Sequence, residues 1–332
     1  MKRMINTFIR KTCEAVSRDI QQSPVLEKML LAQGMTAARH IREIQKVETL
    51  ADVELRIFSQ WGEDGIIEWL VHHNGPMPPS FIEFGVEDYT ESNTRFLLMA
   101  RNWRGLILDG SQGHIAKIKA DAISWRHDLT AVSAFITRDN INGLISSARF
   151  SGDIGLLSVD IDGNDYWVWQ AIEAVSPHIV VVEYNAVLGD LAALTIPYDP
   201  AFARGKAHFS HLYWGASITA FARLANAKGY SLLGTNAAGC NAFFVRNDRM
   251  ARFAGRINDQ RPRPSRLRDS RDEAGGMTFA TGAGRRSVIA GCAFVNLDTG
   301  QTGPLAGVEP LYSSRWINVM AGAAPPAAAP AP

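Results

Sequence analysis

The feature that most constrains the fold of this chain is an uninterrupted apolar run near its middle, Ile179-Val-Val-Val182. Strands with one face in water alternate apolar and polar side chains, whereas strands buried on both faces of a parallel sheet are apolar throughout. The run therefore predicts a mostly parallel sheet within an α/β domain. A chain of 332 residues is long enough for one such domain with extensions.

Strands and helices are expected to alternate around this run. The expected parallel strands span residues 81–85, 105–109, 131–137, 154–160 and 178–184. The expected helices span residues 91–101, 137–145, 166–174 and 217–228. Strands at 230–234 and 241–246 then look like a terminal antiparallel hairpin. This order predicts a Rossmann-like, mostly parallel seven-stranded sheet that ends in a hairpin.

The segments on either side of this domain differ from it in composition. The expected divisions are a helical N-terminal arm at 1–50, the α/β domain at 51–248, an Arg-rich linker at 249–274, an appendage at 275–320 and a disordered Ala/Pro tail at 321–332. The arm is expected to pack on the domain or to form a homo-oligomer. The linker holds eight arginines between Arg249 and Arg271, so it either binds an anionic partner or is a solvated connection.

Charge, cysteine spacing and hydropathy restrict the partners. A formal net charge of +1 gives no general attraction to nucleic acid or anionic membranes. The three cysteines lie too far apart for a zinc motif or a disulfide framework. No run approaches the roughly 18 apolar residues that span a bilayer, and charged residues interrupt residues 1–16 as a signal peptide. We expect a cytoplasmic protein with a small-molecule or glycan substrate, no nucleic-acid partner and no membrane span.

The loop after the first expected strand carries acids where a dinucleotide site needs glycine. It reads Glu83-Phe-Gly85-Val-Glu87, and Gly85 would let the backbone approach a ligand. Its carboxylates would repel a pyrophosphate but not a cofactor that has a sulfonium cation and no phosphate. The loop therefore favours S-adenosylmethionine over NAD or FAD, with an acidic turn of another α/β protein as the alternative. A Gly-Lys-Ser/Thr phosphate-binding loop is absent from the sequence.

The second expected strand ends in Asp109, 26 residues after Glu83, which can accept hydrogen bonds from both hydroxyls of a ribose. A simple Asp-Gly turn is the alternative. Thr137 is placed to cap the helix that follows the third strand and to contact the cofactor. The predicted cofactor-binding residues are Glu83, Gly85, Glu87, Asp109, Thr137 and Asp160.

Acidic residues also follow the fourth and fifth expected strands. Asp160 and Asp162 come after one strand, and Glu183 and Asn185 come at the end of the other, so they face the edge of the sheet where ligands bind. Asp160, Glu183 and Asn185 could hold Mg²⁺ or another hard divalent cation, which would polarise a substrate hydroxyl. Alternatively, the acids cap the next helices and contact the cofactor without metal. Ala171 excludes a calcium loop, which needs a glutamate at that position.

The stretch from Leu188 to Gly215 is placed to bind a substrate. His208 and His211 are three residues apart, so they could share one helical face, and either could act as a general base. A surface or packing role is the alternative for each histidine. The predicted catalytic residues are Asp160, Asp162, Glu183, His208 and His211.

Four motifs give the chain a likeness to a known family. In order and spacing, the chain resembles the FkbM-like family of methyltransferases at Ser59-Gln-Trp-Gly-Glu-Asp64, Phe81-Ile-Glu-Phe-Gly85, Asp160-Ile-Asp-Gly-Asn-Asp165 and Val181-Val-Glu-Tyr184. The resemblance covers roughly residues 55–248 and implies the class I methyltransferase fold, S-adenosylmethionine as cofactor, and O-methylation, often of sugar or polyketide hydroxyls. The chain departs from the family at Glu87, where many methyltransferases have a second glycine, and at Asn164-Asp165, where Ala-Glu is more usual.

These observations predict an enzyme, a cytoplasmic S-adenosylmethionine-dependent O-methyltransferase that acts on a hydroxyl of a carbohydrate or secondary metabolite. In-line positioning of the acceptor oxygen and the methyl group is expected to supply most of the catalysis, and proton removal less. A non-catalytic binding or scaffold protein on a degenerate methyltransferase fold is the alternative, motivated by Glu87 and the long terminal arms. The acidic loop disfavours an NAD-dependent oxidoreductase.

Overall fold

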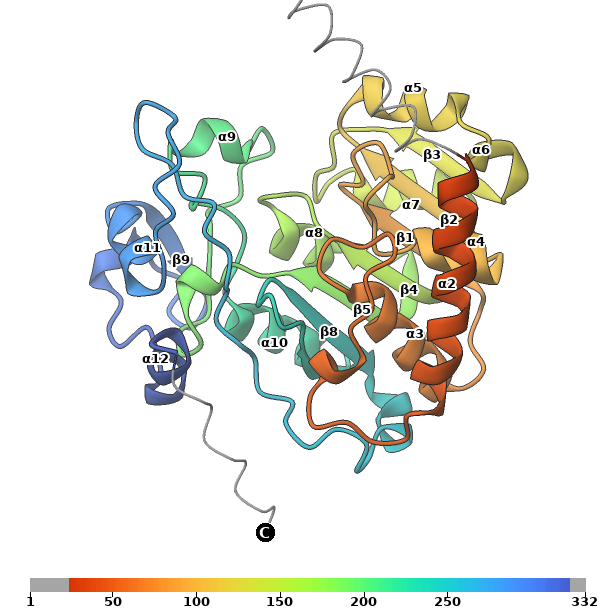
Figure 1. Cartoon of the computed structure of the whole chain (residues 1–332). Coiled ribbons are helices and arrows are strands. Elements are labelled where there is room, and N and C mark those ends of the chain that lie inside the picture. Colours follow the sequence, from red (N-terminus) through yellow and green to blue (C-terminus); the bar gives the residue numbers. More distant parts are fainter. Residues whose placement is uncertain (1–23, 323–332) are drawn as a thin grey trace, which may run out of the picture.

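A computed structural model describes residues 24–322 and contains a seven-stranded sheet (Figure 1). Its strands are β1 (Ser80–Phe84), β2 (Arg104–Asp109), β3 (Leu129–Ser133), β4 (Gly152–Val159), β5 (Val175–Glu183), β7 (Tyr230–Thr235) and β8 (Asn241–Arg246). They lie in the order β3-β2-β1-β4-β5-β8-β7. Strands β1 to β5 pair in parallel, whereas β8 is antiparallel to both β5 and β7. The predicted Rossmann-like sheet with a terminal hairpin is confirmed.

Apolar side chains bury this sheet on both of its faces. On β5, Val180 packs into the apolar core on one face and Val181 into the core on the other, and both side chains are 0% exposed. Ile82 and Phe81 on β1 divide between the two cores in the same way. Because successive strand residues point to opposite faces, a strand in this position is stable only if it is apolar throughout.

Helices cover each face (Figure 1). Those on one face are α7 (Ile141–Ser147), α8 (Asp165–Ala171) and α10 (Ile218–Ala227). Those on the other are α2 (Pro24–Glu43), α3 (Glu63–Asn74), α4 (Arg95–Arg101), α5 (Gln112–Ala120) and α6 (Ile123–Arg126). Short 3-10 turns lie at η1 (Leu50–Val53), η2 (Ala186–Leu188) and η3 (Asn247–Arg252).

The region around the third strand differs from the prediction. β3 ends at Ser133 because the chain then turns across the end of the sheet, where the N–H of Ala134 donates to the carbonyl of Asp109 at 3.0 Å. Thr137 does not cap the next helix, whose N-cap residue is Asn140. Instead, the N–H of Thr137 donates to Oδ1 of Asn140 at 2.8 Å, and its hydroxyl accepts from the N–H of Asn140 at 3.2 Å. Thr137 therefore shapes a turn ahead of α7.

The N-terminal arm is helical in its described part. Helix α2 packs against α3 and α4 (Figure 1). Glu27 of α2 forms an ion pair with Arg95 of α4. The part of the predicted arm at residues 1–23 lies outside the described residues, as do residues 323–332 of the predicted tail.

The C-terminal segments join the chain that follows β5. Strands β6 (Leu194–Thr195), β9 (Ala293–Asn296) and β10 (Thr302–Pro304) form a second, antiparallel sheet, so the stretch after β5 and the appendage share one sheet. The remaining helical elements are α9 (Arg204–Ala207), α11 (Ala283–Val288), η4 (Leu305–Gly307) and α12 (Ser314–Met320). Within residues 24–322, no helix is both long and apolar enough to cross a membrane.

The Arg-rich stretch runs between these two parts without regular secondary structure over residues 258–270. Backbone hydrogen bonds hold it to the sheet domain. The N–H of Asp259 donates to the carbonyl of Glu48 at 2.8 Å, and the N–H of Arg266 donates to the carbonyl of Ala238 at 2.9 Å. The stretch is thus tied to the domain at separate points along its length.

Candidate active site

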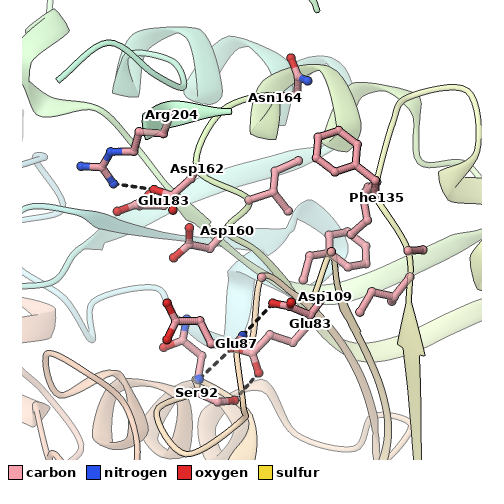
Figure 2. A pocket seen from close by; sticks show the side chains of 18 of the residues that line it. Glu83, Glu87, Ser92, Asp109, Phe135, Asp160, Asp162, Asn164, Glu183 and Arg204 are labelled. Atoms are coloured by element: carbon pink, nitrogen blue, oxygen red, sulfur yellow. Dashed lines mark hydrogen bonds and ion pairs between the residues drawn. The ribbon is translucent and has the colours of Figure 1, made fainter. Parts of the chain in front are cut away.

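A cavity of about 450 Å³ lies at the carboxyl ends of β1, β2, β4 and β5. This is the edge at which open parallel sheets bind ligands. Figure 2 shows Glu83, Glu87 and Asp109 together at one end of the cavity, and Asp160, Asp162 and Glu183 together with Arg204 at the other. The acids expected at the strand ends therefore do meet in one site.

Glu83 on β1 organises the loop that precedes α4. Its carboxylate accepts hydrogen bonds from the hydroxyls of Ser92 and Thr94, each at 2.5 Å, and from the N–H of Asn93 at 2.8 Å. Burial nevertheless raises the pKa of Glu83 above its ordinary value. Because these residues fold around the carboxylate as a loop, α4 begins at Arg95 rather than at residue 91. Glu83 shapes the wall of the cavity through this loop.

Gly85 lets the end of β1 approach the end of β4. Its φ of +72° is a conformation that residues with a Cβ rarely adopt. A Cβ at this position would lie 1.7 Å from the backbone oxygen of Asp160, which is far inside van der Waals contact. Both the positive φ and the lack of room for a Cβ therefore require glycine here. Gly85 lines the cavity between its two acidic ends.

Asp109 at the end of β2 is held in place by backbone groups. Its Oδ2 accepts from the N–H of Glu87 at 2.9 Å and its Oδ1 from the N–H of Ser111 at 2.7 Å. The ring of His114 lies 3.3 Å from the same Oδ1. A carboxylate has about four acceptor positions, so this one retains capacity for a ligand hydroxyl. The hydrogen bond from the N–H of Glu87 therefore holds the acidic loop against Asp109.

The other end of the cavity is a cluster of three carboxylates. Oxygen atoms of Asp160, Asp162 and Glu183 lie within 4.8 Å of one another. Burial, followed by the negative charges of Asp162 and Asp165, raises the pKa of Asp160 well above its ordinary value. Burial and the charges of Asp160 and Asp162 raise the pKa of Glu183 in the same way. Like charges this close disfavour joint ionisation, and a cation bound between them would remove that cost.

The loop that carries this cluster is folded around Asp165. The N–H groups of Ile161 and Gly163 donate to its two carboxylate oxygens at 2.8 and 2.9 Å. Burial raises the pKa of Asp165 to about 6. Beside it, Asn164 lines the cavity and donates to the carbonyl of Asp199 at 2.8 Å. Its Oδ1 is buried without a hydrogen-bond partner in the described part of the chain.

The stretch between Leu188 and Gly215 does reach the cavity, but through different residues from those predicted. Arg204 at the start of α9 lines the cavity and donates to Asp162 at 2.5 Å and to Asp269 of the Arg-rich stretch at 2.8 Å. Its guanidinium lies over the ring of Trp214, 4.7 Å from the centroid. No sequence motif pointed to Arg204, because its two acidic partners are 42 and 65 residues away along the chain.

Four predicted site residues do not line the cavity. One is Thr137, which shapes the turn ahead of α7 instead of contacting the cavity. His208 and His211 follow α9 instead of sharing a helical face, and neither lines the cavity. The ring of His208 lies 2.8 Å from the hydroxyl of Ser210. Asn185 donates to the carbonyls of Leu212 and Trp214, each at 2.9 Å, and accepts from the N–H of Val187 at 3.1 Å. Its amide is committed to the backbone, so Asp162 occupies the place in the carboxylate cluster that Asn185 was expected to take.

No protein-family model and no curated protein matches the sequence. Similar solved structures include the methyltransferase domain of bacterial CtHen1-C, at 13% identity and a TM-score of 0.35 over 55% of this chain and 96% of that chain. An O-methyltransferase from Bacillus cereus in complex with SAH is similar at 11% identity and a TM-score of 0.37, over 63% of this chain and 89% of that chain. A third similar structure is an S-adenosylmethionine-dependent methyltransferase from Clostridium acetobutylicum. It has 10% identity and a TM-score of 0.35, over 55% of this chain and 90% of that chain. Because these TM-scores are below 0.5, the fold class is assigned from the strand order of the sheet.

Proposed function

We propose that the protein is an S-adenosylmethionine-dependent methyltransferase that methylates a hydroxyl of a carbohydrate or a secondary metabolite. The observation that carries this proposal is the two-ended cavity at the carboxyl edge of the sheet. One end offers Asp109 to a ribose, and the other offers the Asp160–Glu183 pair to an acceptor hydroxyl. The resemblance of four motifs to the FkbM-like family agrees with this function.

The charge of the lining supports a cofactor without phosphates. Among the described residues around the cavity, seven are Asp or Glu and one, Arg204, is basic. Arg204 is already paired with two carboxylates, so a pyrophosphate of NAD or FAD would meet uncompensated negative charge. The same carboxylates attract a sulfonium cation. The electrostatics of the cavity therefore favour S-adenosylmethionine over a dinucleotide.

The cofactor end of the cavity also provides an aromatic surface. Phe135 follows β3 and lines the cavity with its side chain 53% exposed (Figure 2). An aromatic ring in this position offers a face on which adenine can stack. Asp109 would then accept from the ribose hydroxyls, with Glu87 held beside it. Sequence patterns gave no indication of Phe135, because it lies in the turn that replaces the predicted end of the third strand.

At the acceptor end, the Asp160–Glu183 pair is placed to receive the proton of the hydroxyl. A carboxylate with a raised pKa is a stronger base than an ordinary one, which suits proton removal near neutral pH. Arg204 orients Asp162 next to this pair. When bound, S-adenosylmethionine supplies the electrophilic methyl group. The walls of the cavity hold the acceptor oxygen in line for the transfer, which is the larger part of the expected catalysis.

The three carboxylates also fit a hard divalent cation. They offer only oxygen ligands, and Oε2 of Glu183 is buried without a hydrogen-bond partner among the described residues. Asp160, Asp162 and Glu183 would hold the ion, which would lower the pKa of a hydroxyl bound to it.

A calorimetric titration with Mg²⁺ and Mn²⁺ tests this cation site directly. We expect Asp160→Asn to weaken cation binding at least about tenfold, because it removes one charged ligand from the centre of the cluster. The exposed Asp139 provides the matched control, and Asp139→Asn should leave binding unchanged. Equal binding by the wild type and the Asp160→Asn variant would show that the carboxylates work without a metal at this position.

The first test of the proposed function is a titration of the protein with S-adenosylmethionine, S-adenosylhomocysteine and NAD. Selective binding of the first two is the expected result. Binding of NAD in their place would favour an oxidoreductase. Binding of S-adenosylhomocysteine without turnover over a broad panel of acceptors would favour the second candidate, a non-catalytic protein on a degenerate methyltransferase fold.

Asp109 is the residue whose replacement should weaken cofactor binding. Asp109→Asn removes a charged acceptor for the ribose hydroxyls, and hydrogen bonds to charged groups contribute about 1.5–3 kcal/mol. We expect the Kd for S-adenosylhomocysteine to rise about tenfold or more, measured by calorimetry. The exposed Asp128 lies outside the cavity lining, so Asp128→Asn should bind as the wild type does. Unchanged affinity of the Asp109→Asn variant would contradict the ribose assignment.

A further inference from the structure

A second cavity, of about 550 Å³, lies where the Arg-rich stretch passes between α12 and the loop that joins β7 to β8. Ala237 of this loop forms part of its lining, together with Pro264 to Leu267 of the stretch and the end of α12. Thr281 and Gly282, just before α11, close another side. Four segments far apart in the sequence therefore meet around this space, at a location separate from the proposed active site.

The lining of this second cavity is cationic. It includes Arg263, Arg266 and Arg315, and among its described residues there is no Asp or Glu. By contrast, the proposed active site is lined mainly by acids. A chain whose formal net charge is only +1 thus concentrates three guanidinium groups in one cavity.

Of these three arginines, only Arg315 forms an ion pair within the described part of the chain. The guanidinium of Arg263 donates, among residues 24–322, only to the hydroxyl of Thr49, at 3.3 Å. Arg266 makes no hydrogen bond or ion pair through its guanidinium among the described residues. The charge of Glu54 acts on both Arg263 and Arg266 from a greater distance. Among the described residues, Arg315 forms an ion pair only with Asp259, at 3.7 Å, and the charge of Asp190 acts on it from further away. Asp259 forms two shorter bonds with Arg261, at 2.8 and 2.9 Å.

Arg315 provides an independent indication that the cavity is suited to an anion. Its side chain is 15% exposed, and its Nε is buried without a hydrogen-bond partner in the described chain. Its Nη1 donates to the carbonyl of Pro262 at 2.7 Å, which fixes the guanidinium in place. Burial and the positive charges of Arg261 and Arg263 lower the pKa of Arg315. An anion in the cavity would relieve this repulsion and satisfy the orphaned donor.

We propose that this cavity binds the phosphate group of a small anionic molecule. Guanidinium groups donate in a planar fork that matches phosphate oxygens, and a phosphate presents enough oxygens to engage three arginines at once. Each carboxylate has only two oxygens, so even a tricarboxylate such as citrate cannot engage all three arginines through one group. The hydroxyl groups of Ser265 and Thr281 on the same lining supply neutral donors for the remaining phosphate oxygens.

Calorimetric titration of the full chain with inorganic pyrophosphate and inorganic phosphate tests the site, with citrate as the carboxylate probe. We expect pyrophosphate to bind more tightly than citrate, with an affinity that falls as salt is added. Arg266→Gln should weaken pyrophosphate binding about tenfold or more. Arg266 is exposed and has no partner to lose within the described residues, so this variant should fold normally.

Arg268 provides a matched control on the same stretch. It is exposed and lies outside the cavity lining, and within the part of the chain that the structure describes its side chain donates only to the carbonyl of Phe279. Arg268→Gln changes the net charge equally and should leave pyrophosphate affinity within about twofold. Equal losses in both variants, no binding by the wild type at millimolar pyrophosphate, or equal affinity for citrate would each overturn the proposal. S-adenosylhomocysteine binding should be the same in both variants, so the outcome is independent of the proposed active site.

Discussion

Glu183→Gln is expected to lower the turnover number about 100-fold or more while leaving the affinity for S-adenosylhomocysteine within a few-fold of wild type. The substitution keeps the size and shape of the side chain but removes its capacity to take a proton. General-base groups contribute about 10²–10⁴ to the rate where proton transfer accompanies the reaction. Glu183 lies at the acceptor end of the cavity, away from Asp109, so cofactor binding should be little affected (Figure 2).

Release of S-adenosylhomocysteine with an acceptor that the wild-type protein methylates measures this effect. Glu173→Gln makes the same chemical change at an exposed position after α8 and should retain full activity. A Glu183→Gln variant that turns over at the wild-type rate would remove Glu183 from the proton path. In that case positioning alone would account for catalysis at this site.

Gly85→Ala is expected to destabilise the fold by about 3 kcal/mol or more and to abolish measurable binding of S-adenosylhomocysteine. Its Cβ would stand 1.7 Å from the backbone oxygen of Asp160, and its φ of +72° adds backbone strain. Since the contact is with backbone, no side-chain rotation can relieve it. The ends of β1 and β4 must separate, and the two ends of the cavity must move apart with them.

Urea unfolding followed by circular dichroism measures the stability change. Gly110 supplies a close control, because it lines the same cavity and the nearest atom to its added Cβ would be Phe135 Cδ2, at 3.7 Å. Gly110→Ala should therefore cost about 0.5 kcal/mol or less, as at an unconstrained surface position. Similar stability losses in the two variants would show that the close approach at Gly85 is not what holds the strands together.

Local patterns predicted the sheet and the positions of the site acids. The run Ile179-Val-Val-Val182 lies at 0% exposure in the centre of β5, and the acids expected at strand ends lie at the edge of the sheet that holds the cavity. The boundaries of elements were less accurate where side chains redirect the backbone. Around Glu83 and Asn140, hydrogen bonds to loop N–H groups delay the start of the next helix.

The composition of the acceptor end depended on contacts that no local pattern encodes. Asn185 was a plausible oxygen ligand because of its position after β5. Its amide group instead donates hydrogen bonds to the carbonyls of Leu212 and Trp214. His208 and His211 were suitable bases by residue type, but α9 ends before them. Arg204 was not singled out, yet it is the residue of that stretch that reaches Asp162.

The sequence by itself determined which segments are buried strands and which strand ends carry acids, because burial on two faces and the turn at Gly85 each demand particular residue types locally. Only the tertiary structure decided which side chains face the cavity and which form hydrogen bonds with backbone groups instead. It also decided where the charges gather. The acids of β1, β2, β4 and β5 meet at one edge of the sheet. Arg263 and Arg266 meet Arg315, which is far from them in the chain, around a second cavity. These long-range contacts depend on how the elements pack, which the spacing of residues along the sequence does not specify.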